Sequence, residues 1–297
     1  MTSPSSLPLS AVVTRLRAAG CVFAEDEAHL IVTTARTPAD LAAMVERRAA
    51  GLPLEHVLGW AEFCGLRMTV EPGVFVPRRR TEFLVRRAVA LARRSAAGSP
   101  DRPPSRPPVV VVDLCCGSGA VGAALAAALG RAELHATDID PAAVRCARRN
   151  LAAAGGLVHR GDLYAPLPAA LRGRVGLLVA STPYVPSEAI GLLPAEARLH
   201  EPRVALDGGA DGLDVVRRVA AEAPRWLAPD GFLLVETGRH QAERAAEIVS
   251  RSGLVPEVAV SDELDATVVI GTVVVVAVVD AVGTGPRSGP DPGPARP

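Results

Sequence analysis

The chain has 297 residues, enough for one large domain or two smaller ones with a substantial buried core. It carries 32 basic and 32 acidic residues, so its formal net charge is zero and no overall field would draw it to nucleic acid or to a membrane surface. The five cysteines form no CxxC pair and the six histidines show no ligand spacing, which argues against a disulfide framework or a metal centre. The first ten residues lack the basic and apolar parts of a signal peptide, so we expect a cytoplasmic protein without a membrane span.

Residues 1–55 predict a small helical domain. Apolar residues recur at three- and four-residue spacing in segments 11–19, 25–35 and 38–50. Residues 56–77 hold short apolar runs between glycines and prolines, which is typical of a β-hairpin, and we expect this hairpin to link two domains. A helix from Thr81 follows, and we interpret the seven arginines of residues 78–94 as a solvated face rather than a surface for RNA or an acidic partner.

From residue 109 onward, strand-like and helix-like segments alternate. This alternation predicts an α/β fold with a doubly wound, mostly parallel sheet that binds ligands at the carboxyl ends of its strands. The last two strand-like segments, 255–261 and 266–279, have no helix between them, so we expect a terminal antiparallel hairpin. We assign residues 78–282 to this domain and residues 283–297, rich in Gly and Pro, to a disordered tail.

The domain is organised around residues 109–129. A strand of β-branched residues ends in Asp113, and an Ala- and Leu-rich helix begins a few residues later. The turn between them contains Gly117, Ser118 and Gly119. Glycine permits close approach of a ligand, and free N–H groups at the helix start favour a polar group. Asp138 ends the next strand, where its carboxylate could accept both hydroxyls of a ribose, so the segment predicts a site for an adenosine-containing cofactor.

The glycine spacing alone leaves two cofactors open. Gly117, Gly119 and Gly122 match GxGxxG, which nicotinamide dinucleotide enzymes share. Asp113, which closes the strand before the glycines, would repel a pyrophosphate but attract an ammonium group. Asp162 ends the third strand, where it can accept a hydrogen bond from an adenine amino group. S-adenosyl-L-methionine carries an ammonium, a ribose and an adenine, which these three aspartates match in chain order, so we favour it over a nicotinamide cofactor.

The chain also resembles a known family, the protein-(glutamine amide nitrogen) methyltransferases that modify peptide chain release factors. The resemblance rests on segment 51–85 with its Pro77–Glu82 stretch, on DLCCGSGAVG from Asp113, on GDLY at 161–164, on the long run 196–219, and on 231–243. It implies a class I S-adenosylmethionine-dependent methyltransferase fold. It further implies methyl transfer to the side-chain amide of a glutamine in the Gly-Gly-Gln loop of a release factor.

The resemblance also assigns roles to residues. The family's Asn-Pro-Pro-Tyr motif corresponds here to residues 181–184, Ser-Thr-Pro-Tyr, which implies catalytic roles for Ser181, Pro183 and Tyr184. In the family, the Asn side chain and a backbone carbonyl hold the substrate amide so that its nitrogen faces the methyl group. The implied cofactor-binding residues are Asp113, Cys115, Gly117, Ser118, Gly119, Asp138, Asp162, Leu163 and Ser181. No metal ligand is implied.

Two positions depart from the family pattern. Ser181 is shorter than Asn and lacks its fixed donor and acceptor pair, so we expect slowed rather than abolished catalysis. The chain holds a single Asn, Asn150, and all of its basic residues are Arg, which indicates a compositional bias against Asn. Cys115 replaces the first glycine of the family's loop, and we expect it to be tolerated there with a negative φ.

Other interpretations remain open at this point. The altered motif is compatible with another acceptor, either a different protein or a small metabolite, or with a cofactor-binding module that has lost turnover. An amine of a nucleic-acid base is a further acceptor for sites with a similar motif, but the neutral charge argues against it. We expect a monomer without stable nucleic-acid binding.

Overall fold

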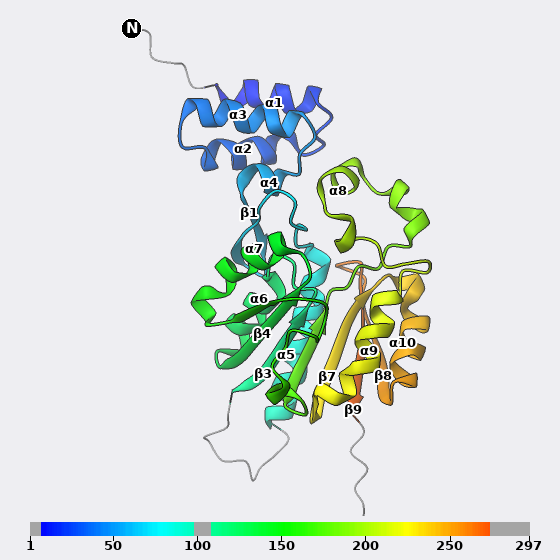
Figure 1. The fold of residues 1–297 in the computed structure, drawn as a ribbon. Helices are drawn as coiled ribbons and strands as arrows, with labels where there is room; N and C mark the ends of the chain where they lie inside the picture. Colours follow the sequence, from blue (N-terminus) through cyan, green and yellow to red (C-terminus); the bar gives the residue numbers. More distant parts are fainter. Residues whose placement is uncertain (1–6, 98–107, 274–297) are drawn as a thin grey trace, which may run out of the picture.

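The computed structural model describes residues 7–97 and 108–273. Within these residues, seven strands form one sheet in the order β5-β4-β3-β6-β7-β9-β8, and β1 and β2 form a separate hairpin (Figure 1). All neighbours in the large sheet are parallel except β9, which runs antiparallel to both β7 and β8. The predicted doubly wound sheet with a terminal antiparallel hairpin is confirmed. The predicted tail, residues 283–297, lies outside the described residues.

The strands are β1 (Trp60–Phe63), β2 (Leu66–Thr69), β3 (Val109–Leu114), β4 (Ala132–Asp138), β5 (Leu157–Arg160), β6 (Val175–Ala180), β7 (Leu227–Thr237), β8 (Leu254–Ser261) and β9 (Ala266–Val273). The helices are α1 (Leu9–Ala18), α2 (Ala24–Thr34), α3 (Pro38–Ala49), α4 (Leu54–Leu58), α5 (Glu82–Ala97), α6 (Ala120–Leu129), α7 (Pro141–Leu151), α8 (Ala195–His200), α9 (Asp214–Trp226) and α10 (Ala242–Arg251).

Helices cover both faces of the large sheet, and the central strands β3 and β6 are accordingly apolar, apart from Asp113 near the end of β3. In β3, Val111 packs with α5, α6 and α7 on one face, whereas Val110 and Val112 pack with α9 and α10 on the other. This opposite orientation follows from the two-residue period of a strand. Two apolar layers result, with the sheet between them.

The first four helices pack around a core of their own, formed by buried residues that include Leu16, Ile31 and Met44. In Figure 1 they lie above the large sheet and connect to it through α4 and the hairpin β1–β2. Gly59 ends α4 with a φ of +79°, a conformation that glycine adopts without strain, and the chain enters β1 directly afterwards.

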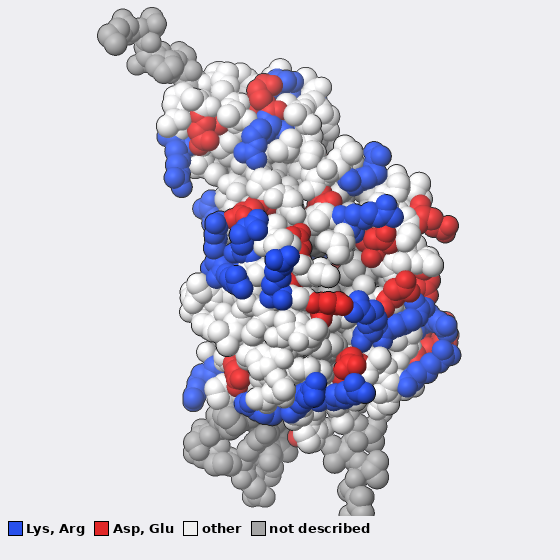
Figure 2. All heavy atoms as spheres, in the orientation of Figure 1, with Lys and Arg blue, Asp and Glu red and all other residues white. Residues whose placement is uncertain are grey.

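The arginines around α5 do not form a continuous basic face. Three of them are in ion pairs, namely Arg78 with Glu201, Arg86 with Glu82, and Arg87 with Glu257. On the face seen in Figure 2, basic and acidic side chains are interspersed with uncharged surface. Within residues 7–97 and 108–273, no helix has the length and apolar character needed to cross a bilayer, and no three His, Cys, Asp or Glu side chains group as metal ligands.

Candidate active site

Four neighbouring strands end at the same level of the sheet. Leu114 of β3 is paired with Thr137 of β4 and with Ala180 of β6, and Ala180 in turn is paired with Val235 of β7. The next residues on these strands therefore form one row, which consists of Asp138, Cys115, Ser181 and Glu236. A cavity of about 520 Å³ lies over this row, and all four residues line it. Sequence reasoning pointed to the first three and missed Glu236.

The turn after β3, residues 115–119, is called the glycine loop here. Gly117 has a φ of +53°, and a Cβ at this position would have no atom within 4 Å, so the backbone lies open towards the cavity. A Cβ at Gly119 would instead lie 3.1 Å from Ala147, because the loop packs tightly on α7. The two glycines thus serve different purposes, one ligand access and the other close packing.

Cys115 adopts a φ of +56°, so the condition on which its tolerance was expected, a negative φ, is not met. The loop requires a left-handed conformation here, which a residue with a Cβ adopts at a cost of about 1 kcal/mol. Burial raises the pKa of the Cys115 thiol above its usual value, so the thiol stays protonated and neutral beside the cavity. The same burial effect applies to its neighbour Cys116.

Asp113 is almost fully buried at the end of β3, with 1% of its surface exposed. Its Oδ2 accepts a hydrogen bond from the N–H of Gly122 at 2.9 Å, whereas its Oδ1 has no partner among the described residues. Burial is the main cause that raises the pKa of Asp113 from 3.8 to about 7, and the nearby carboxylate of Asp138 adds to the rise. A cation placed beside Asp113 would supply the missing partner and stabilise the charged form.

Asp138 already anchors the loop structure. Its Oδ2 accepts the N–H of Gly117 at 2.8 Å and its Oδ1 accepts the N–H of Asp140 at 2.9 Å. Burial raises its pKa, and these backbone hydrogen bonds oppose the rise. A carboxylate offers about four acceptor positions, so both oxygens can still accept further hydroxyl groups.

Asp162 and Leu163 lie at the neighbouring side of the cavity, after β5. Asp162 forms an ion pair with Arg218 of α9, with 2.5 Å between oxygen and nitrogen. Sequence reasoning missed Arg218, because the two residues are far apart in the chain. Leu163 has a φ of +47°, and both it and the half-exposed Ile139 line the cavity, so they offer apolar contacts for a planar base.

Asn150, the single asparagine of the chain, fastens the glycine loop to the hairpin. Its side-chain amide donates to the carbonyl oxygens of Ser118 and Thr69, both at 2.8 Å, and its Oδ1 accepts the N–H of Thr69 at 2.9 Å. The side chain therefore connects α7, β2 and the loop at once. Ser118 is buried and lines the cavity, and the hydrogen bond from Asn150 holds its backbone carbonyl in place there.

Residues 181–184, called the acceptor motif here, follow β6. Val185, the next residue, exchanges backbone hydrogen bonds with the segment before α9, accepting from Gly208 at 2.9 Å and donating to Leu206 at 3.0 Å. A Cβ on Gly212, whose φ is +77°, would lie only 2.2 Å from the carbonyl oxygen of Tyr184. Residues 206–212 therefore pack directly against the backbone of the acceptor motif, and glycines at 208 and 212 leave the space for this contact.

Glu236 faces the acceptor motif from the end of β7. It is 2% exposed, and its Oε2 accepts a hydrogen bond from the hydroxyl of Ser181 at 3.3 Å. The hydroxyls of Thr81 and Tyr184 also interact with this carboxylate, and burial raises its pKa above the usual value. Burial and the proximity of Glu236 together raise the pKa of Tyr184 to about 12, so the phenol remains protonated. An acidic residue that ends an apolar strand was the signal in the sequence.

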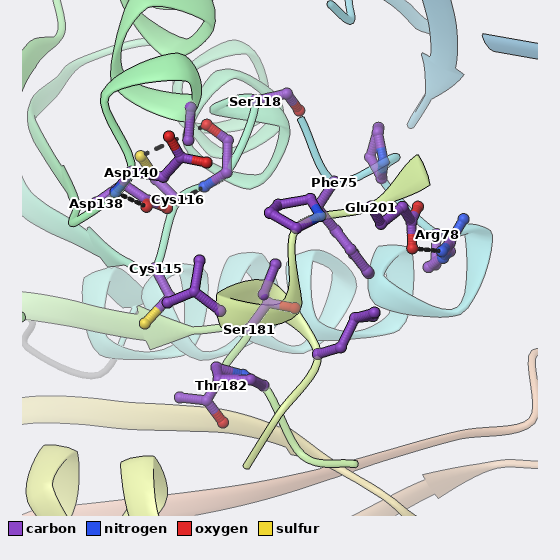
Figure 3. A pocket seen from close by; sticks show the side chains of 18 of the residues that line it. Phe75, Arg78, Cys115, Cys116, Ser118, Asp138, Asp140, Ser181, Thr182 and Glu201 are labelled. Carbon is purple, nitrogen blue, oxygen red and sulfur yellow. Dashed lines mark hydrogen bonds and ion pairs between the residues drawn. The ribbon is translucent and has the colours of Figure 1, made fainter. Parts of the chain in front are cut away.

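The far wall of the cavity comes from the linker and from the segment around α8. In Figure 3, Ser181 lies between the glycine-loop side, marked by Cys115, and the far wall, marked by Phe75. Glu201 accepts from Arg78 at 2.5 Å and from the N–H of Val76 at 3.2 Å, which attaches the α8 segment to the linker. The cavity is thus enclosed by parts of the chain more than 100 residues apart.

The residues that line this cavity fit S-adenosyl-L-methionine. The unpartnered Oδ1 of buried Asp113 suits an ammonium, and Asp138 has acceptor positions left for ribose hydroxyls. Ile139 and Leu163 offer the apolar surface that an adenine ring needs. The geometry brings the acceptor motif and all of the predicted cofactor residues except Gly119 together around one cavity, and Gly119 packs against α7 instead.

Comparison with known proteins identifies the family. Residues 104–175 match the family model "Methyltransferase small domain". The chain is 39% identical over 221 residues to the release factor glutamine methyltransferase of Geobacter sulfurreducens, across 73% of this chain and 72% of that protein. It is 36% identical over 215 residues to the 4-amino-L-phenylalanine/4-methylamino-L-phenylalanine methyltransferase of Streptomyces pristinaespiralis, across 70% and 69% of the two chains. Among solved structures, the ribosomal protein L11 methylase of Lactobacillus delbrueckii subsp. bulgaricus is 16% identical with a TM-score of 0.45, across 68% of this chain and 83% of that one. The match to the Geobacter sulfurreducens protein shows that the chain belongs to the release factor glutamine methyltransferase family.

Proposed function

We propose that this protein methylates the side-chain amide nitrogen of a glutamine in a peptide chain release factor, with S-adenosyl-L-methionine as the methyl donor. Family membership supports this function. The observation that carries it is the shared cavity, in which the glycine loop and the acceptor motif lie next to each other at the ends of β3 and β6. We further propose that it acts as a monomer in the cytoplasm, with a helical domain in residues 1–55 and a linking hairpin in residues 56–77.

On the donor side, we assign one contact to each polar part of the cofactor. Asp113 would hold the ammonium, Asp138 the ribose hydroxyls and Asp162 the adenine amino group. Asp162 can do so while it keeps Arg218, because a carboxylate accepts several hydrogen bonds. When bound, S-adenosyl-L-methionine supplies an electrophilic methyl group on a sulfonium centre. The remaining contacts in this proposal come from Cys115, Gly117, Ser118, Leu163 and Ser181, which line the cavity, whereas Gly119 allows the close packing of the loop on α7.

On the acceptor side, the chain has to orient a weak nucleophile. The lone pair of an amide nitrogen is delocalised into the carbonyl group, so catalysis depends on holding the nitrogen in line with the methyl carbon. Ser181 and the carbonyl oxygen of Thr182 would accept the two N–H groups of the substrate amide. Pro183 and Tyr184 would form the wall on which the planar amide packs. Their positions are held from behind by Gly208 and Gly212.

The test uses the purified protein, a release factor and S-adenosyl-L-methionine with a labelled methyl group. We expect label in the release factor, on the glutamine of its Gly-Gly-Gln loop, as located by mass spectrometry of the digested product. A release factor with that glutamine replaced by glutamate is the matched control and should take no label. Absence of label from the unaltered release factor, with cofactor binding intact by calorimetry, would refute the proposal.

A second acceptor class has support from one observation. The relative from Streptomyces pristinaespiralis carries an aromatic amine in its name, and its similarity is close to that of the release factor enzyme from Geobacter sulfurreducens. An aromatic amine is a better nucleophile than an amide and needs less positioning, which would suit the shorter Ser181. The same assay with 4-amino-L-phenylalanine in place of the release factor separates the two acceptors.

A further inference from the structure

Glu236 is a buried carboxylate of the cavity, beside the acceptor motif, to which neither the cofactor assignment nor the acceptor assignment gives a role. It stands next to Ser181 in the row of strand ends, since Ala180 and Val235 are paired in the sheet. It lines the cavity although only 2% of its surface is exposed. A carboxylate in such a place is costly unless hydrogen bonds compensate it. The position of Glu236 therefore indicates a role in the site.

The hydrogen bond between Ser181 and Glu236 determines the direction of the serine hydroxyl. A hydroxyl has one proton to donate and two lone pairs to accept with. The carboxylate is an acceptor only, so the proton of Ser181 points to Oε2 at 3.3 Å and the lone pairs of Oγ are left for other donors. Thr81 and Tyr184 also donate their hydroxyl protons to Glu236. A carboxylate has about four acceptor positions, so Glu236 can accept from these two hydroxyls and from Ser181 at the same time.

We propose that Glu236 is a positioning residue that turns the Ser181 hydroxyl into a hydrogen-bond acceptor for an N–H of the substrate nitrogen. In this role Ser181 reproduces with its Oγ what the carbonyl oxygen of an asparagine side chain offers by itself. The pair of Ser181 and Glu236 together takes the place of one asparagine. This inference rests on the proposed function, because it concerns the nitrogen that the enzyme methylates.

A charge-neutral isostere tests the direction of the hydrogen bond. In Glu236→Gln, the side-chain amide can donate to Oγ of Ser181, which releases the serine proton to point at the substrate N–H. We expect kcat for the release factor to fall about tenfold or more, in line with one misdirected hydrogen bond in the transition state. The affinity for S-adenosylhomocysteine, measured by calorimetry, should stay within about twofold, because Glu236 does not contact the cofactor in this assignment. Glu263→Gln, at an exposed position in the turn between β8 and β9, is the matched control and should leave both quantities unchanged.

A double-mutant cycle separates this role from a general structural one. Once Ser181→Ala has removed the hydroxyl, Glu236→Gln should lower kcat by no more than about twofold further, because its effect passes through Ser181. Two independent effects that multiply would overturn the inference, as would a Glu236→Gln variant with the activity of the unaltered enzyme.

The pH profile provides a test that needs no change at Glu236. The carboxylate must be ionised to accept from Ser181, so kcat should fall on the acid side as Glu236 takes up a proton. The groups that face it are Arg80 and Thr81 from the segment before α5, and Ser181 and Tyr184 from the acceptor motif. In Ser181→Asn, whose carbonyl oxygen is an acceptor in its own right, this acid limb should disappear. An acid limb that persists unchanged in Ser181→Asn would overturn the inference even if Glu236→Gln does not fold.

The outcomes also distinguish the inference from the function on which it rests. If the unaltered enzyme binds S-adenosylhomocysteine but transfers no methyl group to the release factor, the proposed function fails and the inference fails with it. If the unaltered enzyme does transfer and the Glu236 and Ser181 variants behave independently, the inference alone fails.

Discussion

Replacement of Asp113 by asparagine should stabilise the cofactor-free protein at alkaline pH. The pKa of Asp113 rises from 3.8 to about 7 in the folded chain. A carboxyl group with a raised pKa in the folded state contributes stability below about pH 4 and loses it as the pH rises through about 7. The shift of about 3 pKa units corresponds to a cost of about 4 kcal/mol at pH 8, since each unit is about 1.4 kcal/mol. Asp113→Asn keeps the acceptor for the N–H of Gly122 but brings an unpartnered NH2 group, which costs about 1–2 kcal/mol.

We therefore expect Asp113→Asn to raise the free energy of unfolding by about 2 kcal/mol at pH 8 and to lower it slightly at pH 4. Urea denaturation without cofactor, followed by circular dichroism at both pH values, measures this difference. Asp230→Asn removes one negative charge from an exposed position of β7 and serves as the control. A variant that is destabilised equally at both pH values would refute the argument that the buried charge is the source of the cost.

The same carboxyl group should link cofactor binding to proton release. The ammonium of S-adenosylhomocysteine favours the ionised form of Asp113, so binding near pH 7 should release part of a proton and tighten as the pH rises. Calorimetry in buffers with different ionisation enthalpies counts the protons. The release should be absent in Asp113→Asn, together with a weaker affinity, and persistence of the full release in this variant would place the titrating group elsewhere.

Three further substitutions test the framework of the site. Cys115→Gly should stabilise the protein by about 1 kcal/mol in urea denaturation, because glycine adopts a positive φ without strain. Asn150→Ala removes three hydrogen bonds around the glycine loop, so it should cost about 2–4 kcal/mol of stability and weaken the binding of S-adenosylhomocysteine in calorimetry. Gly212→Ala should lower kcat at least about tenfold, because its Cβ would displace the carbonyl of Tyr184. Gly253→Ala, which has an equally positive φ but open space around it, should show the backbone strain without the loss of activity.

The fold and much of the site follow from short-range patterns in the sequence. The alternation of apolar runs with helical segments predicted the parallel sheet, and acidic residues at strand ends predicted where Asp113, Asp138 and Asp162 would gather. Glu236 ends an apolar strand in the same way and could have been found by the same rule. It lies on the acceptor side of the cavity, one strand beyond Ser181, where no polar group of a nucleoside cofactor requires an acidic residue.

Other features depend on contacts that no local pattern reveals. Arg218 meets Asp162 only because the segment after β5 packs against α9, 56 residues away in the chain. The positive φ of Cys115 is imposed by the path of the loop, which the type of residue at this position does not reveal. Asn150 stood out in the sequence by its rarity alone, and its three partners became apparent only from the packing of α7 against the hairpin.

Helices α2 and α3 are connected to the acceptor motif through α8. Arg48 of α3 is buried between Glu27 of α2 and Glu196 of α8, at 2.6 Å from each. The α8 segment then continues to Leu206, whose carbonyl oxygen holds the N–H of Val185. A displacement of α2 and α3 relative to the sheet would consequently be transmitted through α8 to Val185, the residue that follows Tyr184 of the acceptor motif.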